Sequence, residues 1–127
     1  MASSPGSYAI TFDEPDVVVL TLSGHQNGET IRAATEQMSK TLETRRVRFA
    51  YFAVDDIESF HPNVASAGAD LLALLKKHGV EMSVATTKNG AVRMMGQTIS
   101  FAAGFKLRFV STRSEAYARL ADARLGR

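Results

Sequence analysis

Short apolar runs alternate along this chain with longer segments whose apolar residues recur at helical spacing. Residues 17–22 form a continuous apolar run with one threonine, which is typical of a strand covered on both faces. Residues 28–43 instead follow the period of a helix, whose apolar face carries Ile31, Ala34, Met38 and Leu42. This alternation favours an α/β fold built on a largely parallel sheet.

The remaining elements continue the alternation. Residues 8–12 alternate like a half-buried strand and join the run at 17–22 through a turn, so the two predict a hairpin that ends at Gly24. Later patterns predict strands at 48–54, 80–85 and 106–110, and helices at 62–78, within 91–101 and from Thr112 onward. The expected order is β-β-α-β-α-β-α-β-α, with a four- to five-stranded mixed sheet, helices packed against it and residues 48–54 as its central strand.

Length favours one domain. With 127 residues, 45% of them hydrophobic, the chain can bury a single sizeable core. The first seven residues, MASSPGS, carry no apolar run. We therefore expect a disordered tail over residues 1–7 and one domain over residues 8–127.

Composition argues against several functional classes. The chain has no cysteine, which removes disulfides, thiol catalysis and thiolate metal sites. Fifteen Lys and Arg against thirteen Asp and Glu leave a net charge of +2 without the basic patch that nucleic-acid binding needs. No apolar run reaches the roughly 18 residues of a membrane span. We expect a cytoplasmic protein that does not bind nucleic acid and has no membrane span.

Candidate catalytic and metal-binding residues are few. The histidines at 25, 61 and 78 do not have the spacing of a zinc site, and His78 beside Gly79 suits a helix end. Asp55, Asp56 and Glu58 could suggest magnesium binding or acid/base catalysis, but a solvated loop after the central strand is the favoured interpretation. Met94 and Met95 are expected in the core. We therefore expect no catalytic residues, metal or cofactor.

The order and spacing of three segments resemble those of STAS domains, which include bacterial anti-sigma-factor antagonists, stressosome proteins and the cytoplasmic tails of sulfate transporters. The first segment is VVLTLSG at 18–24, ending in the Ser-Gly that precedes the family's first helix. The second is the strand at 49–54 with the leucine-rich helix that ends at Gly79, and the third is SEAYARL at 114–120 in the closing helix. The resemblance spans nearly the whole chain.

In that family a serine in an Asp-Ser-Ser-Gly-like segment, at the start of the second helix, takes a phosphate from a partner kinase. An ungapped comparison places residues 60–64 over this switch, with His61 at the usual acidic position and Pro62 at the phosphoacceptor. A gapped comparison places residues 65–68 there and makes Ser66 the acceptor. The ungapped comparison is favoured because it keeps the helix length. It predicts Pro62 at or within one residue of the helix start, with His61 or its neighbour capping and Asn63 facing solvent.

The resemblance implies a non-enzymatic regulatory module that binds another protein. The expected partner is a kinase-like anti-sigma factor or a second copy of the chain. The expected docking and switch region comprises Asp56, Ser59, His61, Pro62, Asn63 and Ser66. The alternative function is a small-molecule or lipid-binding domain, because related folds hold apolar ligands between sheet and helix.

Overall fold

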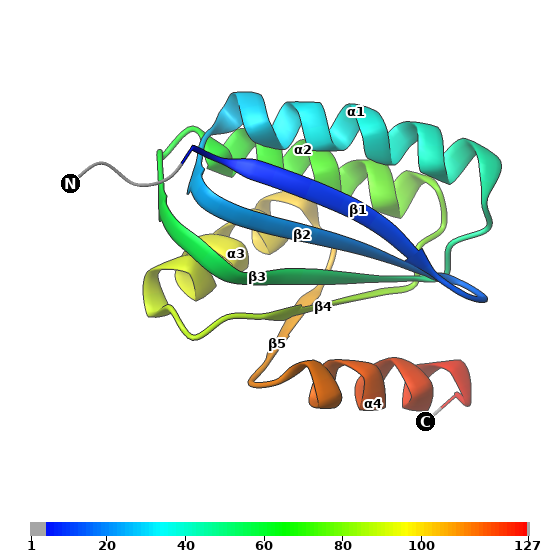
Figure 1. The fold of residues 1–127 in the computed structure, drawn as a ribbon. Coiled ribbons are helices and arrows are strands. Elements are labelled where there is room, and N and C mark those ends of the chain that lie inside the picture. Colours follow the sequence, from blue (N-terminus) through cyan, green and yellow to red (C-terminus); the bar gives the residue numbers. More distant parts are fainter. Residues whose placement is uncertain (1–4, 127) are drawn as a thin grey trace.

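The computed structural model describes residues 5–126, which form a sheet and its covering helices (Figure 1). In chain order the elements are β1 (Ser7–Asp13), β2 (Val17–Gln26), α1 (Gly28–Thr44), β3 (Phe49–Phe60), α2 (Val64–Lys77), β4 (Met82–Thr86), α3 (Gly90–Ala103), β5 (Leu107–Val110) and α4 (Arg113–Arg124). This order confirms the one predicted from the sequence.

The strands form one mixed sheet in the order β1-β2-β3-β4-β5. β1 runs antiparallel to β2, and the other neighbours are parallel. The hairpin, the mixed sheet and the central position of β3 are therefore confirmed. A central strand has a neighbour on both sides, so its first half, which pairs with β2 and β4, is buried.

Helices cover both faces of the sheet. Figure 1 shows α1 and α2 on one side and α4 on the other. Residues of α1, α2 and α3 share one hydrophobic cluster, whereas Ala116 and Leu120 of α4 belong to a second cluster across the sheet. None of the helices within residues 5–126 is long and apolar enough to cross a membrane.

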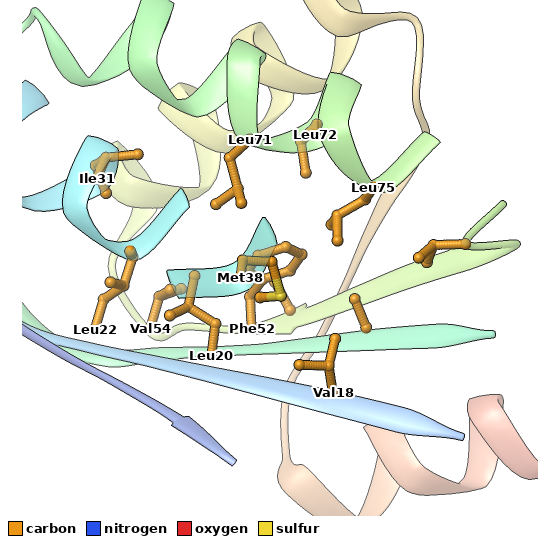
Figure 2. Packing of buried hydrophobic residues seen from close by; sticks show 14 of the residues in the cluster. Val18, Leu20, Leu22, Ile31, Met38, Phe52, Val54, Leu71, Leu72 and Leu75 are labelled. Carbon is orange, nitrogen blue, oxygen red and sulfur yellow. The ribbon is translucent and has the colours of Figure 1, made fainter. Parts of the chain in front are cut away.

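The core follows from the alternation of side chains along β2. Val18, Leu20 and Leu22 point toward the three-helix side, where they meet leucines of α2 (Figure 2). Val17 and Val19 point to the opposite side, against α4. Both sets are buried, which explains why residues 17–22 read as a continuous apolar run.

Both long strands extend further than the sequence indicated. Gly24 does not end β2; it adopts a left-handed φ of 74° beside a register shift, and the strand continues to Gln26. Likewise β3 continues through Asp55, Asp56 and Glu58 to Phe60, so the solvated loop expected there is a strand. Parallel pairing with β4 stops at Ala53, and beyond it β3 has β2 as its only neighbour among the described strands.

Two further predictions, for the start of the chain and for α3, are corrected by the structure. Ser7 opens β1 opposite Ser23, and Pro5 forms an isolated bridge to His25, so these two residues pair with β2 instead of lying in the predicted disordered tail. Residues 1–4 of that tail lie outside the described part. Met94, expected in the core, is 70% exposed on α3, whereas Met95 packs against the core.

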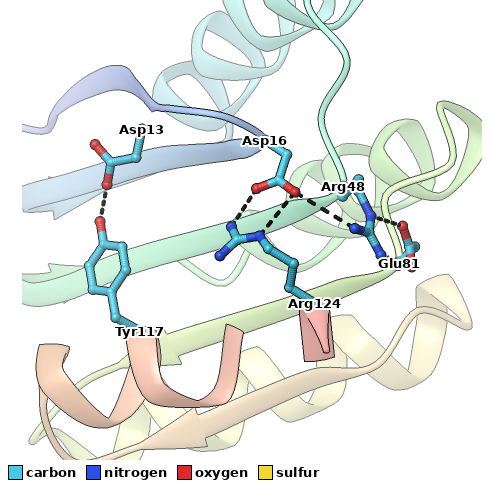
Figure 3. A network of polar contacts seen from close by, with 6 residues as sticks. All are labelled: Asp13, Asp16, Arg48, Glu81, Tyr117 and Arg124. Atoms are coloured by element: carbon cyan, nitrogen blue, oxygen red, sulfur yellow. Dashed lines mark hydrogen bonds and ion pairs between the residues drawn. The ribbon is translucent and has the colours of Figure 1, made fainter. Parts of the chain in front are cut away.

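Side-chain contacts attach α4 to the turn between β1 and β2 (Figure 3). The Tyr117 hydroxyl donates a hydrogen bond to the Asp13 carboxylate. Arg124 donates to Asp16, with 3.3 Å between Nε and Oδ2, and the Asp16 side chain is only 9% exposed. The network continues from Asp16 to Arg48 and Glu81. The last helix is thus held to the first hairpin by polar contacts as well as by apolar packing.

We expect Tyr117 to make the fold sensitive to alkali. Burial, followed by the hydrogen bond to Asp13, raises the pKa of the Tyr117 phenol. A raised pKa in the folded state stabilises the fold fully below the ordinary tyrosine pKa of about 10, and this contribution is lost as pH rises through the raised value. Urea unfolding across that range should show the free energy of unfolding falling more steeply for the native chain than for Tyr117→Phe. Equal slopes would contradict the prediction.

Candidate functional site

The candidate site lies where β2 and β3 end and α1 and α2 begin. The last residues of the two strands, Gln26 and Phe60, are paired neighbours. The next backbone amide, that of His61, donates to the Gln26 carbonyl oxygen at 2.9 Å. The starts of both helices therefore meet at the carboxyl edge of parallel strands, the edge where α/β proteins commonly bind ligands.

A tight turn over residues 61–63 leads into α2. The Val64 amide donates to the His61 carbonyl at 3.1 Å, and the Ala65 amide donates to the Pro62 carbonyl at 3.2 Å. The His61 Nδ1 atom accepts from the backbone amide of Asn63 at 3.0 Å. The first helical residue is Val64 rather than Pro62, so the helix begins two residues later than predicted. Pro62 supplies the turn, where its missing N–H costs nothing.

Asn63 connects the two helix starts. It is exposed, as expected, but its Oδ1 atom accepts the backbone amide of Gly28, the first residue of α1, at 2.8 Å. The preceding residue, Asn27, caps α1 by accepting the Thr30 amide at 3.0 Å. A Cβ atom at Gly28 would lie 3.2 Å from Asn63 and 3.3 Å from the Arg32 guanidinium, which places this cation beside the junction.

The two serines of the predicted region lie in different surroundings. Ser59 is half-buried in β3, and its hydroxyl shares a 2.7 Å hydrogen bond with Nδ1 of His25, its cross-strand partner. This bond is a contact between adjacent strands. Ser66 is exposed as the third residue of α2. Only Ser66 of this pair therefore presents its side chain openly near the helix start.

Asp56 lies apart from the turn. It pairs with Ser23 within the sheet and lines an open hollow together with Asp55 and Glu58 of β3 and residues of the first hairpin. Within residues 5–126, no group of three or more histidine, aspartate or glutamate side chains is placed to hold a metal ion. The predicted region thus divides into an acidic stretch of β3 and the junction around His61, Pro62 and Asn63.

Some residues of the junction were missed by the sequence prediction. Asn27 and Gly28 follow an apolar strand as an ordinary cap and helix start, and no spacing in the sequence signals the hydrogen bond from Gly28 to Asn63. Gln26 was also missed, although it is only 1% exposed. A polar residue next to a cap reads as part of a turn, and its burial depends on the unexpected length of β2.

Solved structures match this fold, although no protein-family model matches the chain. No curated protein matches it either. The anti-sigma factor antagonist SpoIIAA, in its unphosphorylated form, matches with a TM-score of 0.70 at 14% identity, covering 91% of this chain and 96% of that chain. The chain has a STAS-like fold. An anti-sigma factor antagonist from Mycobacterium paratuberculosis matches with a TM-score of 0.68 at 15% identity, covering 93% and 96% of the two chains.

A third match is the Bacillus cell fate determinant SpoIIAA in its phosphorylated form, with a TM-score of 0.67 at 12% identity over 90% of this chain and 99% of that chain. The STAS-like fold predicted from three short segments is therefore confirmed. At these identities the likeness establishes the arrangement of strands and helices.

Proposed function

We propose that this protein is a non-enzymatic regulatory module of the anti-sigma-factor-antagonist type, which binds a protein partner through the junction at the starts of α1 and α2. The observation that carries the proposal is the contact between the exposed turn before α2 and the start of α1. The exposed turn of His61, Pro62 and Asn63 stands at the start of α2 and is hydrogen-bonded to α1 through Asn63. The turn and the start of α1 therefore lie side by side, so that one partner surface can contact both.

The partner we propose is a kinase-like anti-sigma factor, with a second copy of the chain as the alternative, and we place the interaction in the cytoplasm. The junction suits an acidic partner surface. The two helix starts carry partial positive charge from their helix dipoles, and Arg32 adds a full positive charge beside them. The likeness to solved anti-sigma factor antagonists supports this class of partner.

Replacing Pro62 by glutamate should abolish partner binding. Pro62 is exposed, so the variant places a negative charge where the acidic partner surface would dock, without disturbing the core. The matched control is Arg119→Glu, which changes an exposed residue of α4 on the other side of the sheet. Tagged protein would be used to capture partners from the native lysate, and light scattering would report self-association. The proposal requires an anti-sigma-type kinase, or a dimer, that is lost with Pro62→Glu and kept with Arg119→Glu. The reverse pattern contradicts it.

We further propose that the junction works without phosphorylation. Residues 60–64 contain no hydroxyl, and proline stands where the ungapped comparison places the phosphoacceptor. Incubation with the captured kinase and ATP, followed by phosphopeptide mapping, should leave these residues and Ser66 unmodified. Ser66 is the alternative phosphorylation site that tests this proposal most directly, because it is exposed in the first turn of α2. Phosphate on Ser66, lost in Ser66→Ala together with regulated binding, would overturn this part of the proposal.

A further inference from the structure

An apolar cavity of about 100 Å³ lies between the sheet and the three helices α1, α2 and α3. Its walls come from Leu22 and Phe52 of the sheet, Leu71 and Leu72 of α2, and Met95 and Ile99 of α3. Gln26, at the end of β2, is the only polar side chain among its lining residues. A single polar group in an otherwise apolar wall is a common arrangement in small-molecule sites, where it fixes the orientation of the ligand.

The amide group of Gln26 is only half satisfied. Its Nε2 atom donates to the carbonyl oxygens of Ser7 at 3.1 Å and Ser23 at 2.7 Å. Reversing the amide would place its oxygen against two other oxygens, so the two bonds fix its orientation. The remaining atom, Oε1, is buried and has no hydrogen-bond partner among the described residues. Leaving such an acceptor unpaired costs about 1–3 kcal/mol.

Water is a poor occupant of this cavity. A buried water molecule needs about two to four polar partners, and the lining side chains supply only the Gln26 amide. An apolar cavity of roughly 150 Å³ in another protein stays dry and accepts benzene. A space somewhat smaller than that suits a molecule with a single ring or a short chain. Met95 in the α3 wall is unbranched and can adjust to its shape.

We propose that this cavity binds a small neutral molecule with an apolar body and one hydroxyl or N–H group, which donates a hydrogen bond to Gln26 Oε1. The apolar body fills the space under α2, and the donor satisfies the buried acceptor. The site lies directly beneath the junction, because Val64 lines the cavity and the Gln26 carbonyl accepts the His61 amide. The proposal is independent of protein docking, since it concerns the interior of the fold.

Phenol and toluene test this proposal because they are nearly the same size and differ in having a hydroxyl or a methyl group. Each would be titrated into the ¹⁵N-labelled full-length chain and followed by NMR. Both should perturb residues of the cavity wall, and phenol alone should shift the side-chain amide signals of Gln26. The variant Ala85→Leu, which fills the cavity from β4, should remove binding of both.

The deciding variant is Gln26→Met, which keeps the length of the side chain and removes the acceptor. Toluene affinity should change by less than about threefold, because the apolar cavity remains, and this binding also reports that the variant is folded. Phenol affinity should fall about tenfold or more, because its hydroxyl would be buried unpaired. An equal effect on both probes, or no cavity perturbation by either, overturns the proposal. If Gln26→Met does not fold, the native chain decides: phenol that binds without shifting the Gln26 amide contradicts the assigned hydrogen bond.

Discussion

Replacing Phe52 by aspartate should destabilise the fold by at least about 4 kcal/mol. Phe52 is 5% exposed on the central strand β3 and packs in the cluster under α1 and α2. The substitution removes a large apolar side chain and puts a carboxylate among apolar groups, where it has no counter-charge. Since a domain of this size is typically stable by about 5–15 kcal/mol, a large part of its stability would be lost.

The same substitution at Phe101 is the matched control. Phe101 is 91% exposed on α3, so Phe101→Asp should change the free energy of unfolding by no more than about 1 kcal/mol. Urea denaturation of the three proteins, followed by circular dichroism, gives the comparison. If the Phe52 variant kept the native midpoint, or if both variants lost equal stability, the buried position of Phe52 would be wrong.

The strands of the core could be predicted because their sequences record burial on both faces. The run at 17–22 and the first part of β3 are apolar without interruption, and both have neighbours on each side and helices above and below. The starts of α1 and α4 could also be predicted from the sequence. Asn27 and Thr112 cap them through their side chains, and such caps depend on residues only two or three positions apart.

The second half of β3 could not be predicted, because its surroundings change partway along the strand. Beyond Ala53 it no longer pairs with β4, so its polar residues face solvent while Ile57 packs against the core. Carboxylates at 55, 56 and 58 therefore appear in a sequence that resembles a loop. Only the pairing with the extended end of β2, which itself depends on the bulge near Gly24, makes this segment a strand.

In the candidate site, too, features set by neighbouring residues could be predicted, whereas contacts between residues far apart in the sequence could not. The start of α2 was predicted from Pro62, and the predicted position was wrong by two residues, because Pro62 lies in the turn before the helix. The hydrogen bond from Gly28 to Asn63 joins residues 35 positions apart and follows from the way β2 and β3 end side by side. The cavity beside Gln26 likewise depends on how three helices pack, which no local pattern specifies.

Leu75→Ala should cost about 2–5 kcal/mol, whereas Leu74→Ala should cost clearly less. The leucines of α2 form one broad apolar face in the sequence, and periodicity does not rank them. The structure does: Leu75 is fully buried at 0% exposure and points into the core (Figure 2), whereas Leu74 is only partly buried at its margin. Removing Leu75 leaves a cavity enclosed by neighbours that cannot close it, while solvent can fill the space left by Leu74.

Urea denaturation of the two alanine variants tests this ranking, because both exchange the same side chain in the same helix and carry the same change in helix propensity. The difference between their unfolding free energies therefore isolates burial. A larger loss for Leu74→Ala would mean that α2 is rotated about its axis relative to the sheet. Such a rotation would also move Leu71 and Leu72 out of the cavity wall and change the orientation of Ser66 at the start of the helix.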